Sequence, residues 1–211
     1  MPTLAEFRTR VLWAVGVTVS AERGLTDANI DEHIRRAVEE FSLHVPAEVS
    51  ADILIAGGSR AFATTALTRP IGVGAVEYPI GQWPRDLVDF DRWGSAVTLD
   101  HAPPPSAYTV RVYYTQQHLV DGSGSTITPA HENVLVEGAA ALAILARAMG
   151  AANAAESAAA TPQTYQHLRV AQTRLDRWRA LLARLSGQVG RRTLYAPAST
   201  PLGHDIVRGP S

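Results

Sequence analysis

The sequence predicts an α+β protein: a helical bundle with an antiparallel long helical hairpin at its C-terminal end, an inserted antiparallel β-rich module and an extended C-terminal arm. Three observations predict this fold. Apolar residues recur at helical spacing near both ends of the chain, β-branched and aromatic residues alternate in its middle, and proline and glycine gather after residue 187. The chain has 211 residues, 46 % hydrophobic and 18 % charged, so it can bury a core.

Residues 1–47 are predicted to supply the N-terminal helices of the bundle. Thr3-Leu-Ala-Glu6 is a capping box, so a first helix should run from Leu4 to about Ala14. Thr26 or Asp27 is a good N-cap for a second helix, which should reach about Leu43 before Pro46 stops it. The apolar stripe of this second helix consists of Ile30, Ile34, Ala37, Val38 and Phe41.

Residues 48–127 are predicted to form the β-rich insert, because turn residues separate short runs of strand-forming residues there. The strand candidates are 53–55, 62–67, 72–78, 96–99 and 108–114. The last is the strongest, since Tyr108, Val110, Val112 and Tyr114 fall on one face. Gly and Ser in 121–125 predict a flexible hinge after it.

Residues 128–190 are predicted to form the helical hairpin, with Thr128 as N-cap and Pro129 at the first helical position. Apolar positions then step by three and four residues along two seams of matching length, as an antiparallel hairpin requires. The seams are Leu135, Gly138, Leu142, Leu145 and Met149, and Leu168, Ala171, Leu175, Trp178, Leu182 and Leu185. Residues 191–211 hold three prolines, two glycines and a few apolar anchors, which predicts an extended arm.

Charge is spread unevenly although the net charge is only −1, which argues against a general nucleic-acid or membrane-surface binder. Acids dominate 22–52, and arginines dominate 161–192. These are either solvated helix faces, contacts within or between subunits, or a row facing DNA phosphates without reading sequence. The candidate subunit-contact or channel-facing residues are Asp31, Glu32, Glu39 and Glu40, and Arg169, Arg174, Arg177 and Arg184.

Enzyme motifs are missing from the sequence: it has no P-loop, no dinucleotide-binding glycines, no zinc-protease helix and no cysteine. Asp86, Asp89 and Asp91 could hold a cation or act as an acid/base pair, but their turn-forming flanks favour a solvated loop with aromatic packing by Trp83 and Trp93. We therefore predict no catalytic residue, no metal ligand and no cofactor. No apolar run approaches the length of a membrane span, so we expect no membrane partner.

The order of elements resembles the head–tail connector (adaptor) proteins of tailed bacteriophages. The resemblance lies in the short capped helix, the acidic helix 31–43, the strand Val110-Arg-Val-Tyr-Tyr114 leading through His118 to Ile127-Thr-Pro-Ala-His131, and the Ala-rich helix from Val136. The resemblance covers about residues 3–187. It rests on the order of the helices and strands and on their general residue character rather than on an invariant motif. The β-rich insert departs from the all-helical members of that family.

The resemblance implies a structural virion protein at the head–tail interface, assembled in the host cytoplasm. Its partners would be the portal protein, tail or stopper proteins, further copies in a ring commonly of twelve, and DNA passing through the channel. By position, the C-terminal arm would engage the portal through Arg191, Arg192, Leu194, Tyr195, Leu202, Ile206 and Val207. Two alternatives stay open: a cytosolic dimeric binding or regulatory protein, and a hydrolase that uses Asp86, Asp89 or Asp91.

Overall fold

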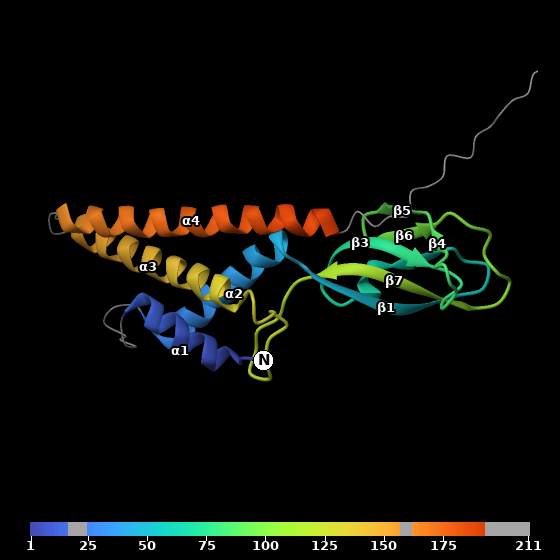
Figure 1. Cartoon of the computed structure of the whole chain (residues 1–211), viewed down its shortest axis with the longest axis horizontal. Coiled ribbons are helices and arrows are strands. Elements are labelled where there is room, and N and C mark those ends of the chain that lie inside the picture. Colours follow the sequence, from blue (N-terminus) through green and yellow to red (C-terminus); the bar gives the residue numbers. More distant parts are fainter. Residues whose placement is uncertain (17–24, 157–161, 193–211) are drawn as a thin grey trace, which may run out of the picture.

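Helices and sheets lie at opposite ends of an elongated molecule in the computed structural model (Figure 1). The structure describes residues 1–16, 25–156 and 162–192. Within them it contains four α-helices and two antiparallel sheets, so the predicted α+β class is confirmed. The helices are α1 (Leu4–Val15), α2 (Asp27–His44), α3 (Glu132–Glu156) and α4 (Pro162–Arg192).

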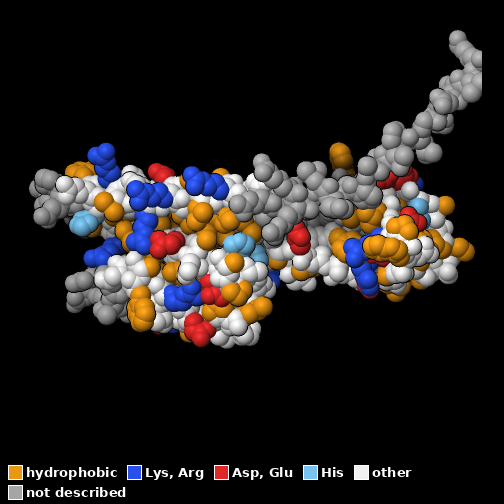
Figure 2. Space-filling view, in the orientation of Figure 1, with side chains coloured by type: hydrophobic (Ala, Val, Ile, Leu, Met, Phe, Trp, Pro, Cys, Tyr) orange, Lys and Arg blue, Asp and Glu red, His pale blue; other side chains and the backbone are white. Residues whose placement is uncertain are grey.

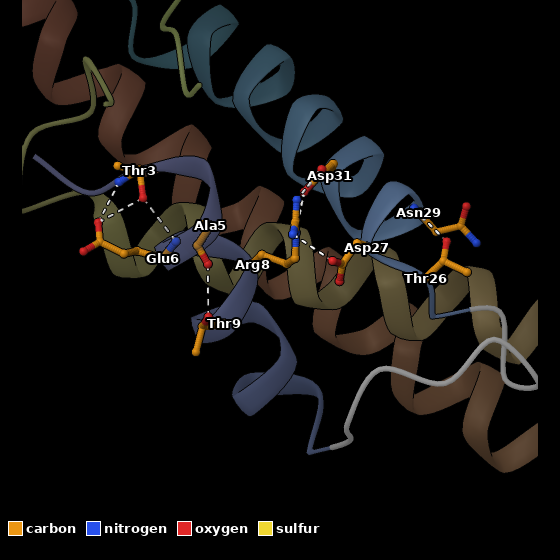
Figure 3. A network of polar contacts seen from close by, with 9 residues as sticks. All are labelled: Thr3, Ala5, Glu6, Arg8, Thr9, Thr26, Asp27, Asn29 and Asp31. Carbon is orange, nitrogen blue, oxygen red and sulfur yellow. Dashed lines mark hydrogen bonds and ion pairs between the residues drawn. The ribbon is translucent and has the colours of Figure 1, made fainter. Parts of the chain in front are cut away.

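Both N-terminal helices begin at the caps that the sequence predicts (Figure 3). The backbone N–H of Glu6 donates to Thr3 Oγ1, and the Glu6 carboxylate accepts from Thr3 N at 2.7 Å, so the capping box is closed. Thr26 caps α2, where its hydroxyl oxygen accepts from Asn29 N at 3.2 Å. Helix α1 ends at Gly16, whose φ of 74° suits glycine.

Helix α3 forms the centre of the bundle and contacts the other three helices. Its run Ala139–Ala141 is fully buried among Phe7, Ile34 and Phe41 of the first two helices. Residues Glu132–Ala151 are long and apolar enough to cross a membrane by length and composition alone, a test that core helices also pass. Their buried alanines pack against protein, which is the behaviour of a core helix.

Two predicted helix ends are wrong. Thr128–His131 is a turn, in which His131 N donates to Thr128 O at 2.9 Å, so α3 begins only at Glu132. Helix α4 continues through Arg191 and Arg192, because a single glycine such as Gly187 costs a helix only about 1 kcal/mol. These two arginines therefore belong to a helix rather than to an extended segment.

The predicted seam on α3 also drifts. Met149 is 51 % exposed, and its neighbour Ala148 is buried instead. Two heptads after Leu135, the buried position of α3 is therefore one residue earlier than the spacing of the seam predicts.

The β module contains two antiparallel sheets. The first has strand order β1-β7-β3-β4 and the second β2-β6-β5. Their bounds are β1 Ala47–Ile55, β2 Ala61–Ala63, β3 Pro70–Glu77, β4 Leu87–Val88, β5 Phe90–Trp93, β6 Ala96–Leu99 and β7 Tyr108–Gln116. The buried face predicted for the central strand β7 is confirmed, and its valines join Val76, Val97 and Leu99 in a core shared by both sheets.

The segment from Asp86 to Asp91 is not the loop that the sequence predicts. It contains β4, at the edge of the four-stranded sheet, and β5, at the edge of the three-stranded sheet. Trp83 and Trp93 are 91 % and 90 % exposed, so the expected aromatic packing is wrong as well. Short edge strands carry charges on their open side, which hides the alternation that marks inner strands.

Two crossings join the bundle to the β module: the step from α2 to β1 at Val45, and the return from β7 through 117–126. The predicted flexible hinge in the return is a hydrogen-bonded turn. Asp121 Oδ1 accepts from Ser123 N at 2.8 Å and from Gly124 N at 3.1 Å, and Leu4 N donates to Asp121 O at 2.8 Å. Those bonds fasten the turn to the start of α1.

Candidate functional site

A groove of about 600 Å³ on the surface of α4 collects most of the predicted arginines. We call it the α4 groove; its lining residues are Glu137 of α3 and Arg169, Val170, Thr173, Arg174, Arg177, Trp178 and Leu181 of α4. Val170 is 64 % exposed and Leu181 is 39 % exposed, so the groove presents apolar surface between guanidinium groups. Figure 2 shows basic side chains along α4. The arrangement suits a partner that is both apolar and acidic.

The floor of the groove is fixed by close packing between α3 and α4. A Cβ atom on Gly138 would lie 2.2 Å from Cε2 of Trp178, so only glycine lets the indole approach this closely. The indole Nε1–H donates to Val134 O at 2.8 Å, which satisfies the one polar atom of this buried side chain. The sequence places both residues on the predicted seams, and the structure brings them into contact.

The predicted arginines divide into engaged and unengaged groups. Arg174 is engaged: it pairs with Glu137 at 3.0 Å and donates to Ala14 O at 3.2 Å, which ties α4 to α3 and α1. Arg169, Arg177 and Arg184 are exposed, and none pairs with a carboxylate in the described part of the chain. Arg184 lies outside the groove lining. Among the described residues, Arg169 and Arg177 are therefore cations without a carboxylate partner inside the groove.

Most of the predicted acidic residues on α2 are already paired within the chain. Asp31 binds the Arg8 guanidinium at 2.7 Å (Figure 3), and Glu40 binds Arg179 at 2.7 Å, which raises the pKa of that arginine. Glu32 pairs with two arginines of its own helix. Glu39 has no ion pair among the described residues; it lines a cavity of about 230 Å³ between the bundle and the β module.

Three of the four tryptophans are exposed, which sequence reasoning missed. Trp13 on α1 is 82 % exposed and joins Trp83 and Trp93 of the β module, whereas Trp178 is 3 % exposed. A tryptophan is among the most buried side chains on average, and an exposed one is typical of a protein contact surface. The signal in the sequence is the turn residue that follows two of them, in Trp83-Pro84 and Trp93-Gly94.

The loop 78–86, which carries Trp83, is held by a buried carboxylate. Glu77 is 2 % exposed; it accepts from Tyr113 Oη at 2.5 Å and from Gly81 N at 2.8 Å. The bond from Tyr113, and then that from Gly81, lowers the pKa of Glu77. Arg85 lies over the Tyr113 ring at 5.2 Å from its centroid. These contacts hold in place the loop that exposes the Trp83 indole.

The carboxylates of Asp86, Asp89 and Asp91 are exposed, and none forms an ion pair with the described residues. They line none of the three surface cavities described here, which lie on α4, on α1 around Trp13, and between α2 and Arg69. In the described part of the chain no group of three or more His, Asp or Glu residues could hold a metal ion.

The predicted portal-binding residues are only partly placed. Arg191 and Arg192 occupy the last turn of α4. Leu194, Tyr195, Leu202, Ile206 and Val207 lie outside the described residues.

Comparison with known proteins finds no family model that matches the chain and no curated protein that matches it. Function is therefore inferred from the surfaces of this chain and from the order of its elements.

Proposed function

We propose that this protein is a structural virion protein of a tailed-phage neck: an adaptor whose copies form a ring that joins the portal to the tail and extends the DNA channel. The observation that carries the proposal is the exposure of Trp13 on the helical bundle and of Trp83 and Trp93 on the β module of an elongated subunit. A subunit inside a ring, with further proteins above and below it, needs several such contact surfaces.

The helices supply the remaining parts of the proposed adaptor. Helices α3 and α4 act as the antiparallel hairpin of each subunit, stiffened by the contact between Gly138 and Trp178. Arg169, Arg177 and Arg184 have no carboxylate partner in the part of the chain that the structure describes. They meet either a neighbouring subunit or the phosphates of passing DNA, without reading sequence. Residues 191–211 engage the portal, beginning from the helical turn that holds Arg191 and Arg192. The role is non-enzymatic and needs no cofactor.

The test is to mix the purified protein with the portal protein encoded in the same genome. Light scattering after gel filtration, followed by negative-stain imaging, should show a ring-shaped complex with nearly equal numbers of the two proteins. Removing residues 193–211 should abolish attachment, while the circular dichroism of the bundle stays unchanged. Formation of a tight dimer that does not bind the portal would contradict the proposal. That result would favour a cytosolic dimeric binding protein instead.

A further inference from the structure

We propose that the α4 groove of one copy binds the β4–β5 edge of a second copy. The β4–β5 edge is defined here as residues 83–93, which carry Trp83 and Trp93 and include one edge strand of each sheet. The inference rests on the proposed ring, because it names the surfaces through which neighbouring subunits would meet.

Unpaired charge on the two surfaces is complementary. In the groove, Arg169 and Arg177 have no carboxylate partner in the described part of the chain, and the one lining acid, Glu137, is occupied by Arg174. Opposite charges on two surfaces speed their association and fix its register more than they increase the affinity. The groove therefore needs an occupant with unpaired carboxylates.

The β4–β5 edge supplies those carboxylates. Asp86, Asp89 and Asp91 are exposed and unpaired among the described residues. The two arginines of the edge are turned to their own module: Arg85 lies over the Tyr113 ring, and Arg92 directs two nitrogens at the carbonyl oxygens of Gly94 and Ile71, each at 3.4 Å. The charge left for a partner is negative.

Helix α2, the other acidic element, cannot supply the occupant without breaking pairs inside its own chain. Asp31 and Glu40 are held at 2.7 Å by Arg8 and Arg179, and Glu32 is held within its helix. Its one unpaired acid among the described residues, Glu39, lines the cavity beside the β module. This excludes the acidic helix as the favoured partner of the groove.

Apolar surface on the two sides is complementary as well. Val170 and Leu181 are exposed in the groove, and Leu87 of the edge is 38 % exposed between the two exposed tryptophans. Acids on an edge strand alone would be explained as protection against unwanted strand pairing. The two exposed indoles beside these acids do not fit that explanation, because they leave apolar surface in solvent. Such a surface is typical of a contact site for another protein.

The two surfaces belong to opposite parts of the subunit. The groove is on the bundle and the edge is on the β module (Figures 1 and 2). A contact between them joins unlike faces of successive copies, and repetition of such a contact closes a ring when the rotation permits. The groove and the edge thus form the two halves of one head-to-tail interface.

Disulfide trapping tests the contact cleanly, because the chain contains no cysteine. One variant carries Leu87→Cys on the edge, and a second carries Thr173→Cys in the groove; the two are mixed and oxidised with copper phenanthroline. The matched control is Thr9→Cys on α1. Thr9 and Thr173 are both exposed helical residues whose hydroxyls donate to the carbonyl four residues earlier, at 3.0 and 2.9 Å.

Leu87→Cys should crosslink to Thr173→Cys about tenfold faster than to Thr9→Cys. Adding Arg177→Asp to the groove chain should remove that preference, and adding Asp89→Arg to the edge chain should restore it. Equal rates for the two threonine positions, or no recovery with the reversed pair, would overturn the assignment.

This outcome is distinguishable from failure of the proposed function. If the portal mixture gives rings but the two crosslinking rates are equal, the ring stands and its interface lies elsewhere. If the portal mixture gives no ring, the adaptor role fails whatever the crosslinks show.

Discussion

His118 Nε2 lies 3.0 Å from the carbonyl oxygen of Val45, so one imidazole joins the two crossings between the bundle and the β module. Val45 belongs to the outgoing crossing and His118 to the return. The backbone N–H of His118 donates to Ser42 Oγ at 3.0 Å, and its Nδ1 lies 3.0 Å from Thr126 Oγ1. Because a carbonyl oxygen can only accept a hydrogen bond, Nε2 of His118 carries the ring proton and donates a hydrogen bond to Val45 O.

The junction should weaken as pH falls through the range in which histidine titrates. Burial is the main cause that lowers the pKa of His118, and the nearby His131 and Arg69 lower it further, against the hydrogen bonds to Val45 and Thr126. The unfolded chain, whose histidine pKa is about 6.5, then binds more protons than the folded chain. The free energy of unfolding should therefore decrease as pH falls from about 7.5 to about 5.5.

Urea unfolding at the two pH values measures this slope, and His118→Gln should make it smaller. Loss of the buried bonds should also cost about 1–3 kcal/mol at the higher pH. His33→Gln is the comparison: burial lowers the pKa of His33 too, so this change should also flatten the slope, but His33 lies within α2 and its replacement should spare the hydrogen bonds of the crossings at the higher pH. A His118→Gln chain with the slope of the original protein would contradict the assignment.

Gly138→Ala should destabilise the bundle, because the new Cβ would lie 2.2 Å from the Trp178 ring. Overpacking of this kind costs about 1–3 kcal/mol. Gly150→Ala, on the same helix with nothing within 4 Å of its Cβ position, should be neutral or stabilising. Chemical denaturation compares the two variants, and equal stabilities would show that the α3–α4 contact is looser than described.

Substitutions of exposed tryptophans should weaken assembly, whereas substitution of the buried tryptophan should lower stability. Trp13→Ala and Trp93→Ala should change the free energy of unfolding by no more than about 0.5 kcal/mol, because both indoles are in solvent. Trp178→Ala should cost about 3–5 kcal/mol, since it empties a buried site. Calorimetry gives the stabilities, and complex formation with the portal protein should fall for the first two variants. Unchanged assembly in both would remove the main support for the proposed function.

Tyr113→Phe should loosen the loop that carries Trp83. Without the phenol, the Glu77 carboxylate loses its 2.5 Å donor, and its bond to Gly81 N is held less firmly. The amide of Gly81 should then exchange with solvent about tenfold faster, as measured by hydrogen exchange and NMR. Tyr108→Phe is the matched control, because it removes a hydroxyl that donates to Ser59 O, outside the loop 78–86. Faster exchange of the Gly81 amide in that variant as well would indicate general loosening.

Local signals made the helix caps and the central strand predictable. The capping box of Thr3 and Glu6 involves residues three apart, and the buried face of β7 follows from strict alternation. The positions of Gly138 and Trp178 were predictable as seam residues, because each follows the period of its own helix. These features need no knowledge of the rest of the chain.

Tertiary partners decided what could not be predicted. No feature of the sequence near Glu40 indicates that Arg179 is its ion-pair partner, because the pair forms only when α2 and α4 pack together. The same holds for His118, one of seven scattered histidines, whose importance comes from contacts with two distant segments. The turn at Asp121 looked flexible from its glycines, but the bond from Leu4 to its carbonyl becomes visible only in the fold.

The pairing of β1 with β7 bears on how such a protein could gain or lose a whole module. Ala47, where the chain enters the β module, lies directly opposite Gln116, where the chain leaves it. Neighbouring strands are only about 5 Å apart, so a short tight turn could span the same gap. Everything between these residues could be cut out or transplanted onto another helical scaffold while α2 and α3 keep their places, making residues 47–116 a self-contained cassette.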